Sequence, residues 1–123
     1  MLLSSKQIRG QGRGHKVGFP TINLVVPEDL SLDEGIYAVW VVTDGRTYKG
    51  ALHYGAIPTF QLKDKTMEVH LIDITDDTVP VTEDKVIEID VVERIRGVRK
   101  FDDAESLAIQ IAIDIKNVND ILK

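Results

Sequence analysis

One sequence feature restricts the possible folds of this chain more than any other. It is a run of β-branched and aromatic residues that is followed directly by Asp-Gly. The run, Ile-Tyr-Ala-Val-Trp-Val-Val-Thr at residues 36–43, is typical of a strand. The Asp44-Gly45 pair follows it, and such a pair favours the two-residue turns that join antiparallel strands, because both turn positions need a positive φ. Residues 46–53 can then return alongside the first strand. The sequence therefore predicts an antiparallel β-hairpin near the middle of the chain.

Two later segments are also typical of strands. Residues 67–74 alternate between apolar and polar side chains in their first half. Residues 86–95 place apolar side chains on one face with a period of two, namely Ile87, Ile89, Val91 and Ile95. The segment between them, residues 75–84, is polar and contains Pro80, so we expect a loop or a short hairpin arm.

The end of the chain changes to a helical period. Apolar side chains recur there at steps of four, four, three and four, at Leu107, Ile111, Ile115, Val118 and Leu122. Asp102 lies three residues before Glu105, which predicts an N-cap and a capping box. Hairpin-rich strands followed by one helix favour a mainly β fold, a small closed antiparallel barrel with a C-terminal helix over one face or opening. We expect residues 1–123 to form a single domain.

Composition and charge exclude several classes of protein. The chain has no cysteine, which excludes disulfides, thiolate zinc sites and a cysteine nucleophile. No apolar run is long enough for a signal peptide or a membrane span, so we expect no membrane partner and, by default, a cytoplasmic location. The formal net charge is −5, which argues against a general nucleic-acid binder. We also expect a monomer.

A glycine-rich basic segment opens the most informative stretch of the chain, residues 10–23. Glycines permit close backbone approach and can make an anion-binding concavity of N–H groups, and cations add the charge that phosphates need. The candidate nucleotide-binding residues of this segment are Gly12, Arg13, Gly14, Lys16 and Gly18. Their spacing fits neither the Walker A loop nor the dinucleotide fingerprint, and a solvated basic tail or a weak RNA-binding arm is the alternative.

The same stretch closes on Pro20-Thr21-Ile22-Asn23. The proline fixes the backbone next to a hydroxyl and a carboxamide, whose hard oxygens suit Mg²⁺. Thr21 and Asn23 are therefore candidate metal ligands. Pro20 and Thr21 are also candidate nucleotide-binding residues. The alternative is that Thr21 and Asn23 only satisfy local backbone groups in a turn.

Five motifs in order resemble the flavokinase, or riboflavin kinase, family. They are Gly-Arg-Gly-x-x-x-Gly-Phe-Pro-Thr-x-Asn at residues 12–23, Gly-Ile-Tyr-Ala at 35–38, Gly-x-x-Pro-Thr-Phe at 55–60, Glu-x-His-Leu at 68–71, and Ile-Arg, Lys-Phe and the helix pattern from residue 95 to residue 114. Together they cover nearly the whole chain. The resemblance implies a six-stranded barrel that transfers the ATP γ-phosphoryl group to the 5′-hydroxyl of riboflavin, giving FMN and ADP.

The resemblance also implies roles for individual residues. Glu68 matches the glutamate that accepts the proton of the attacking hydroxyl, while Mg²⁺ bridges the phosphates of the co-substrate ATP. Arg96, Phe101 and Leu107 match positions near the flavin. His70 shares a strand face with Glu68 and could orient the site, although a lone strand histidine is more often an ordinary hydrogen-bonded residue. The family's N-terminal nucleotidyltransferase domain has no counterpart in the sequence, so we expect no FAD synthesis.

Several positions depart from the family pattern, and they keep an alternative function open. His53, Ile57, Asp77 and Val98 stand where the family has other residues. These departures favour, as the alternative, a homologue that binds flavin or nucleotide without catalysing transfer. A small barrel that binds single-stranded nucleic acid through residues 9–16 is a more remote hypothesis, because such proteins need exposed aromatic platforms and the chain has only seven Phe, Trp and Tyr residues.

Overall fold

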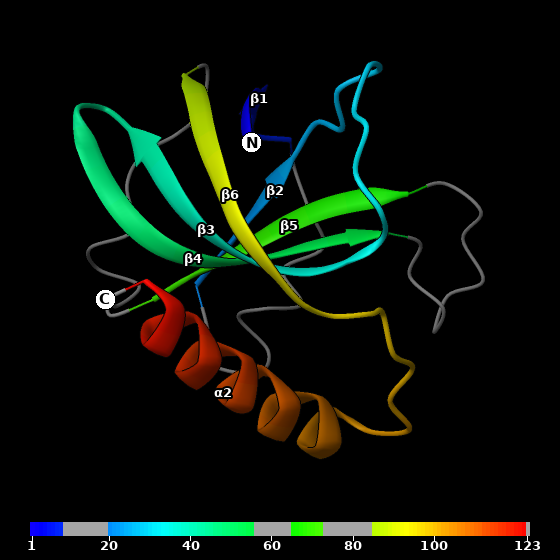
Figure 1. Cartoon of the computed structure of the whole chain (residues 1–123). Helices are drawn as coiled ribbons and strands as arrows, with labels where there is room; N and C mark the ends of the chain where they lie inside the picture. The colour runs from blue at the N-terminus through cyan, green and yellow to red at the C-terminus, as the bar shows by residue number, and fades with distance from the viewer. Residues whose placement is uncertain (9–19, 56–64, 73–84, 123) are drawn as a thin grey trace.

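The computed structural model describes residues 1–8, 20–55, 65–72 and 85–122, which form one antiparallel sheet and a helix (Figure 1). The strands lie in the order β1-β6-β3-β4-β5-β2 across the sheet. The elements are β1 (Leu2–Lys6), β2 (Thr21–Leu24), β3 (Gly35–Thr43), β4 (Arg46–Gly55), β5 (Thr66–Leu71), β6 (Val86–Arg96) and α2 (Ala104–Ile121). The predicted mainly β fold, with six antiparallel strands and a C-terminal helix, is confirmed.

The central hairpin forms where the sequence predicts it. β3 and β4 pair along their whole length, from Gly35 opposite Tyr54 to Thr43 opposite Arg46. The turn between them uses Asp44 at φ 53° and Gly45 at φ 75°. Both values are positive, as a two-residue turn that matches the twist of its strands requires.

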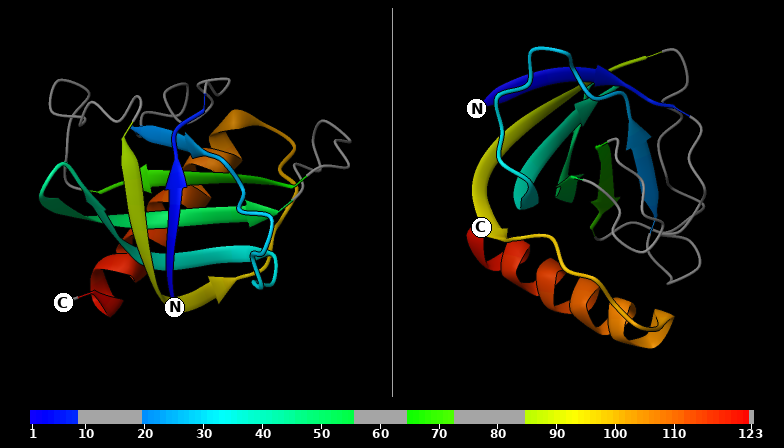
Figure 2. Two further views of the ribbon diagram at one scale, coloured as in Figure 1. Left: turned by 90° about the horizontal axis from the view of Figure 1, so that it is seen from above. Right: turned by 90° about the vertical axis from the view of Figure 1, so that its right-hand side faces the viewer.

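The sheet curls around its own core, and α2 lies against the outside of the curve (Figure 2). Apolar side chains from all six strands meet on the inner face, among them Ile22, Leu24, Val39, Val41, Leu52, Met67, Val69, Ile87 and Ile89. Gly50 belongs to this face, where an added Cβ would lie 2.7 Å from a methyl carbon of Val69. The absence of a side chain there lets the strands approach closely enough to fill the core.

The curl stops short of the closed barrel that we predicted. Two register shifts between β3 and β6, typical of β-bulges, bend the long strand β6. The edge strands β1 and β2 meet only near one end, through a bridge between Gln7 and Leu24 and two flanking backbone hydrogen bonds of 2.8 Å. The structure is thus a half-barrel, and closure is not confirmed.

Helix α2 begins one residue later than predicted. Asp103, not Asp102, is the N-cap, because its carboxylate accepts a hydrogen bond of 2.7 Å from the backbone N–H of Ser106. Val118 of the helix and its C-cap residue Leu122 pack with Ala38 and Ala51 on the outer face of the sheet and with Ile72, which directly follows β5. Across the described residues, no helix has both the length and the apolar character that a membrane span requires.

Candidate active site

A row of polar side chains crosses the outer face of the sheet beside α2. In the register of the neighbouring strands β2, β5 and β4, Asn23 lies opposite Glu68, and Glu68 lies opposite His53. One step along the strands, Thr21 lies opposite His70. Directly opposed residues share a face, with Cβ atoms about 4.5–5.5 Å apart. The fold therefore brings the candidate base, Glu68, next to one candidate metal ligand and diagonal to the other.

Strand β2 is held in a defined position against β5. The backbone N–H of Leu71 donates to the carbonyl of Pro20 at 3.0 Å, so the strand begins at a fixed point. The hydroxyl of Thr21 and Nδ1 of His70 form a hydrogen bond of 2.9 Å. Thr21 and Asn23 are two residues apart on one strand, so both side chains leave the same face.

The side-chain oxygens on this face suit a hard cation that is already bound to other ligands, such as phosphate oxygens. Thr21 and Asn23 offer neutral oxygens, which Mg²⁺ accepts as part of an octahedral shell. The described residues contain no group of three or more His, Cys, Asp or Glu side chains that could hold a metal ion by themselves. The two oxygens therefore fit Mg²⁺ in the form in which nucleotides bind it, with phosphate oxygens supplying other ligands.

Both histidines of the face are held in the neutral state. Burial lowers the pKa of His70 to about 4, and the neighbouring His53 contributes to this shift. Burial also lowers the pKa of His53, and the positive charge of Arg96 adds to that effect. An imidazole that cannot easily take up a proton presents one donor and one acceptor nitrogen to its neighbours.

We expect acid to destabilise the protein through these histidines. A folded-state pKa below the usual value means that stability is fully present above about pH 6.5 and is lost as the pH falls toward 4. Urea unfolding at pH 7, 6, 5 and 4 should show this loss, and His70→Asn should make the decline shallower. An equal decline in the variant would show that His70 contributes nothing to it.

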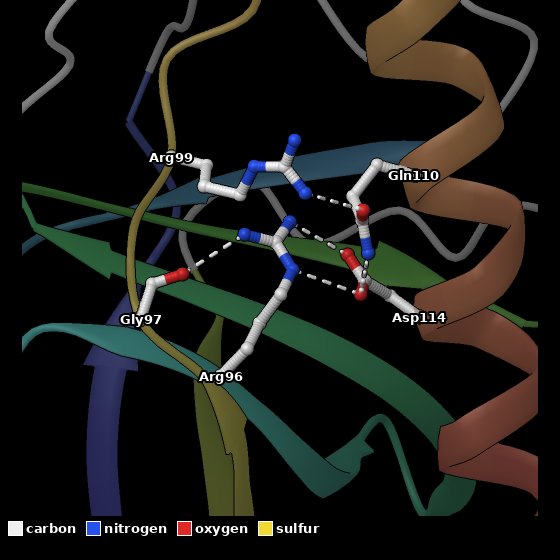
Figure 3. A network of polar contacts seen from close by, with 5 residues as sticks. All are labelled: Arg96, Gly97, Arg99, Gln110 and Asp114. Atoms are coloured by element: carbon white, nitrogen blue, oxygen red, sulfur yellow. Dashed lines mark hydrogen bonds and ion pairs between the residues drawn. The ribbon is translucent and has the colours of Figure 1, made fainter.

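A network of charged and polar side chains joins the end of β6 to α2 (Figure 3). Arg96 donates to both carboxylate oxygens of Asp114, from Nε at 3.0 Å and from Nη2 at 2.8 Å, and its Nη1 donates to the carbonyl of Gly97 at 2.9 Å. Gln110 donates to the same carboxylate at 3.0 Å and accepts from Arg99 at 3.3 Å. The side chain of Asp114 is 4% exposed and that of Arg96 is 19% exposed. This pair fixes the helix against the sheet near His53.

The candidate flavin residues lie in the same region. The guanidinium carbon of Arg96 is 5.9 Å from the centroid of the half-buried Phe101 ring, and that of Arg99 is 5.2 Å from it. Leu107 lies in the first turns of α2 and is partly buried. The structure thus brings Arg96 and Phe101 together. The guanidinium of Arg96 is hydrogen-bonded to the carboxylate of Asp114.

Asp114 and Gln110 are residues that sequence reasoning missed. Asp114 falls between Ile111 and Ile115, inside the apolar stripe of the helix. A charged residue is almost never fully buried unless it is paired. The position of Asp114 in the stripe therefore indicated that it pairs with a basic side chain. The sequence does not say which basic residue this is.

Part of the predicted site lies outside the described residues. This holds for the predicted phosphate loop, Gly12, Arg13, Gly14, Lys16 and Gly18, and for the departures Ile57 and Asp77. The departure at Val98 is described and is half-buried. Its Cγ2 lies 3.0 Å from the position that a Cβ on Gly55 would take.

Comparisons with known proteins agree with this fold. The RNA-binding riboflavin kinase RibR of Bacillus subtilis is 32% identical over 118 residues, 95% of this chain and 49% of that protein. The bifunctional riboflavin kinase/FMN adenylyltransferase of Bacillus subtilis is 33% identical over 111 residues, 87% of this chain and 34% of that protein. The chain thus spans half or less of the length of these relatives.

A solved structure and a family model cover almost the whole chain. The crystal structure of riboflavin kinase from Trypanosoma brucei superposes with a TM-score of 0.70 at 20% identity, over 98% of this chain and 78% of that one, which shows a shared fold. The family model "Flavokinase: Riboflavin kinase" matches residues 1–122. The chain therefore belongs to the riboflavin kinase family.

Proposed function

We propose that this chain transfers the γ-phosphoryl group of ATP to the 5′-hydroxyl of riboflavin, giving FMN and ADP. The observation that carries the proposal is the register of β2 and β5, which sets Glu68 beside Asn23 and one step from Thr21. A carboxylate next to two neutral oxygen ligands is what a base and a nucleotide-bound cation need in one site. Membership of the riboflavin kinase family supports the same reaction.

In this mechanism Glu68 accepts the proton of the ribityl 5′-hydroxyl as its oxygen attacks the γ-phosphorus. The bond between that phosphorus and the β,γ-bridging oxygen breaks, and ADP leaves. Thr21 and Asn23 would hold Mg²⁺, which neutralises charge on the phosphate oxygens when it is bound. Protein groups contribute mainly by positioning the reactants, because phosphoryl transfer requires little covalent work from the enzyme.

The remaining contacts of the two substrates belong to the proposal as well. The basic glycine segment, residues 12–18, would wrap the phosphates with backbone N–H groups and the two cations Arg13 and Lys16. Phe101 and Leu107 would line the flavin site. Arg96 would contribute there by fixing the connection from β6 to α2, since three of its donors are already engaged.

We expect Thr21→Ala and Asn23→Ala to raise the Mg²⁺ concentration needed for half-maximal FMN formation. Residues around a metal ion typically change its affinity by about 10–100-fold even when they do not touch it, so loss of a direct ligand should cost at least tenfold. Excess Mg²⁺ should restore part of the rate. Thr47→Ala, at an exposed threonine on β4, is the matched control and should leave the Mg²⁺ dependence unchanged. Wild-type Mg²⁺ dependence in both site variants would exclude them as ligands.

Measuring whether FMN forms distinguishes the kinase from the non-catalytic alternative. A binding homologue takes up riboflavin or ADP in a titration but forms no FMN from riboflavin and ATP with Mg²⁺. A kinase forms FMN and ADP in equal amounts. Chromatography of the reaction mixture, with a calorimetric titration of ADP in parallel, distinguishes the two.

A further inference from the structure

The hydrogen bond between Thr21 and His70 has a direction that matters for a cation. The two residues lie opposite each other on β2 and β5, and 2.9 Å separates the Thr21 hydroxyl oxygen from Nδ1 of His70. A hydroxyl has one proton to donate and two lone pairs to offer. If the hydroxyl is to bind a cation, its proton must point away from that cation, toward an acceptor.

We propose that His70 is a positioning residue whose Nδ1 accepts the Thr21 proton and so turns the lone pairs of the hydroxyl toward Mg²⁺. This inference rests on the proposed Mg²⁺-nucleotide site. With the ring proton on Nε2, Nδ1 is an acceptor, and the hydroxyl proton of Thr21 points at the ring and not at a cation. With the proton on Nδ1, the ring would donate a hydrogen bond to the Thr21 oxygen. The hydroxyl proton would then point outward, where it would repel a cation.

The geometry of the sheet makes this arrangement rigid. β2 and β5 pair from Thr21–His70 to Leu24–Met67, so neither side chain can shift along its strand without breaking the ladder. Replacing a residue that hydrogen-bonds to a metal ligand and orients it commonly changes metal affinity or activity by about 10–100-fold. His70 does not need to touch substrate to have such an effect.

Two variants of equal shape separate the hydrogen bond from the packing. In His70→Asn, the amide oxygen can take the place of Nδ1 as acceptor. In His70→Leu, a side chain of nearly the same size has no acceptor at all. Binding of ADP to the full chain is measured by calorimetry with and without Mg²⁺, and FMN formation is measured separately.

We expect Mg²⁺ to tighten ADP binding to the wild type, and His70→Leu to reduce this tightening by about tenfold. His70→Asn should keep most of it. Without Mg²⁺ the three proteins should bind ADP alike, whereas a merely structural role would change ADP binding equally in both conditions. In a Thr21→Ala background, His70→Leu should have no further effect, because the acceptor acts through the missing hydroxyl.

Three results would overturn the inference: equal Mg²⁺ effects in His70→Leu and the wild type, equal losses in the Leu and Asn variants, or a wild type whose ADP binding ignores Mg²⁺. FMN formation tests the transfer reaction independently. A wild type that forms no FMN but shows the expected Mg²⁺ pattern would support the role of His70 while contradicting the kinase activity.

Discussion

Glu68→Gln lowers FMN formation by about 10²–10⁴-fold if Glu68 is the general base, the range typical of a lost general acid–base group. The amide keeps the size of the carboxyl group but cannot accept the proton of the attacking hydroxyl. The side chain sits between Asn23 and His53 on the face that we assign to the reaction. The loss should fall on kcat, because the proton moves only during transfer. Steady-state rates of FMN formation, followed by chromatography, measure it.

The matched control for this variant is Glu88→Gln. Glu88 is also a strand glutamate, but it is exposed on β6, outside the assigned row. It should leave kcat unchanged, and both variants should bind ADP as the wild type does. Normal turnover in Glu68→Gln would remove this residue from the role of base.

Asp114→Ala has the largest expected effect on stability. It removes the carboxylate that pairs with Arg96 and accepts from Gln110, and it leaves the guanidinium of Arg96 largely buried without its counter-charge. Breaking a buried pair from one side typically costs about 3–5 kcal/mol. The arginine is partly exposed, so we expect a value toward the lower end. Chemical denaturation gives the change in the free energy of unfolding.

The control for the pair is the double variant Arg96→Met with Asp114→Leu. Replacing both charges by apolar side chains of similar size removes the unpaired charge, and such exchanges are often close to neutral. The double variant should therefore be more stable than Asp114→Ala. If Asp114→Ala unfolded at the wild-type denaturant concentration, the pair would not be what fixes α2 to the sheet.

Elements with a local signal were predictable from the sequence. The hairpin of β3 and β4 depends on a β-branched run and an Asp-Gly turn, and both lie within ten residues of each other. Helix α2 depends on its own apolar period. The position of its N-cap was wrong by one residue, because Asp102 and Asp103 are chemically equivalent and only the backbone geometry selects Asp103.

Elements defined by distant partners were not predictable in the same way. β1 and β2 are short, five and four residues, and they become strands by pairing with β6 and β5 far along the chain. Closure of the barrel depends on how these two edges meet, which no local pattern specifies. The resemblance implied the number of strands, whereas residue patterns alone identified only four.

The candidate site was predictable as a set of residues but not as an arrangement. The motifs named Thr21, Asn23 and Glu68, and only the register of β2 and β5 shows that they share one face. The bond from Thr21 to His70 and the pair of Arg96 with Asp114 join residues 49 and 18 positions apart. Such contacts follow from the fold, so they appear only once the strands and the helix are in place.

The measurement that tests the central claim most directly is FMN formation by the wild-type chain from riboflavin, ATP and Mg²⁺. We predict FMN and ADP in equal amounts, with no product when Mg²⁺ is removed by a chelator. Bound riboflavin or ADP without any FMN would contradict the proposed reaction, and it would show that this member of the riboflavin kinase family binds its ligands without transferring phosphate.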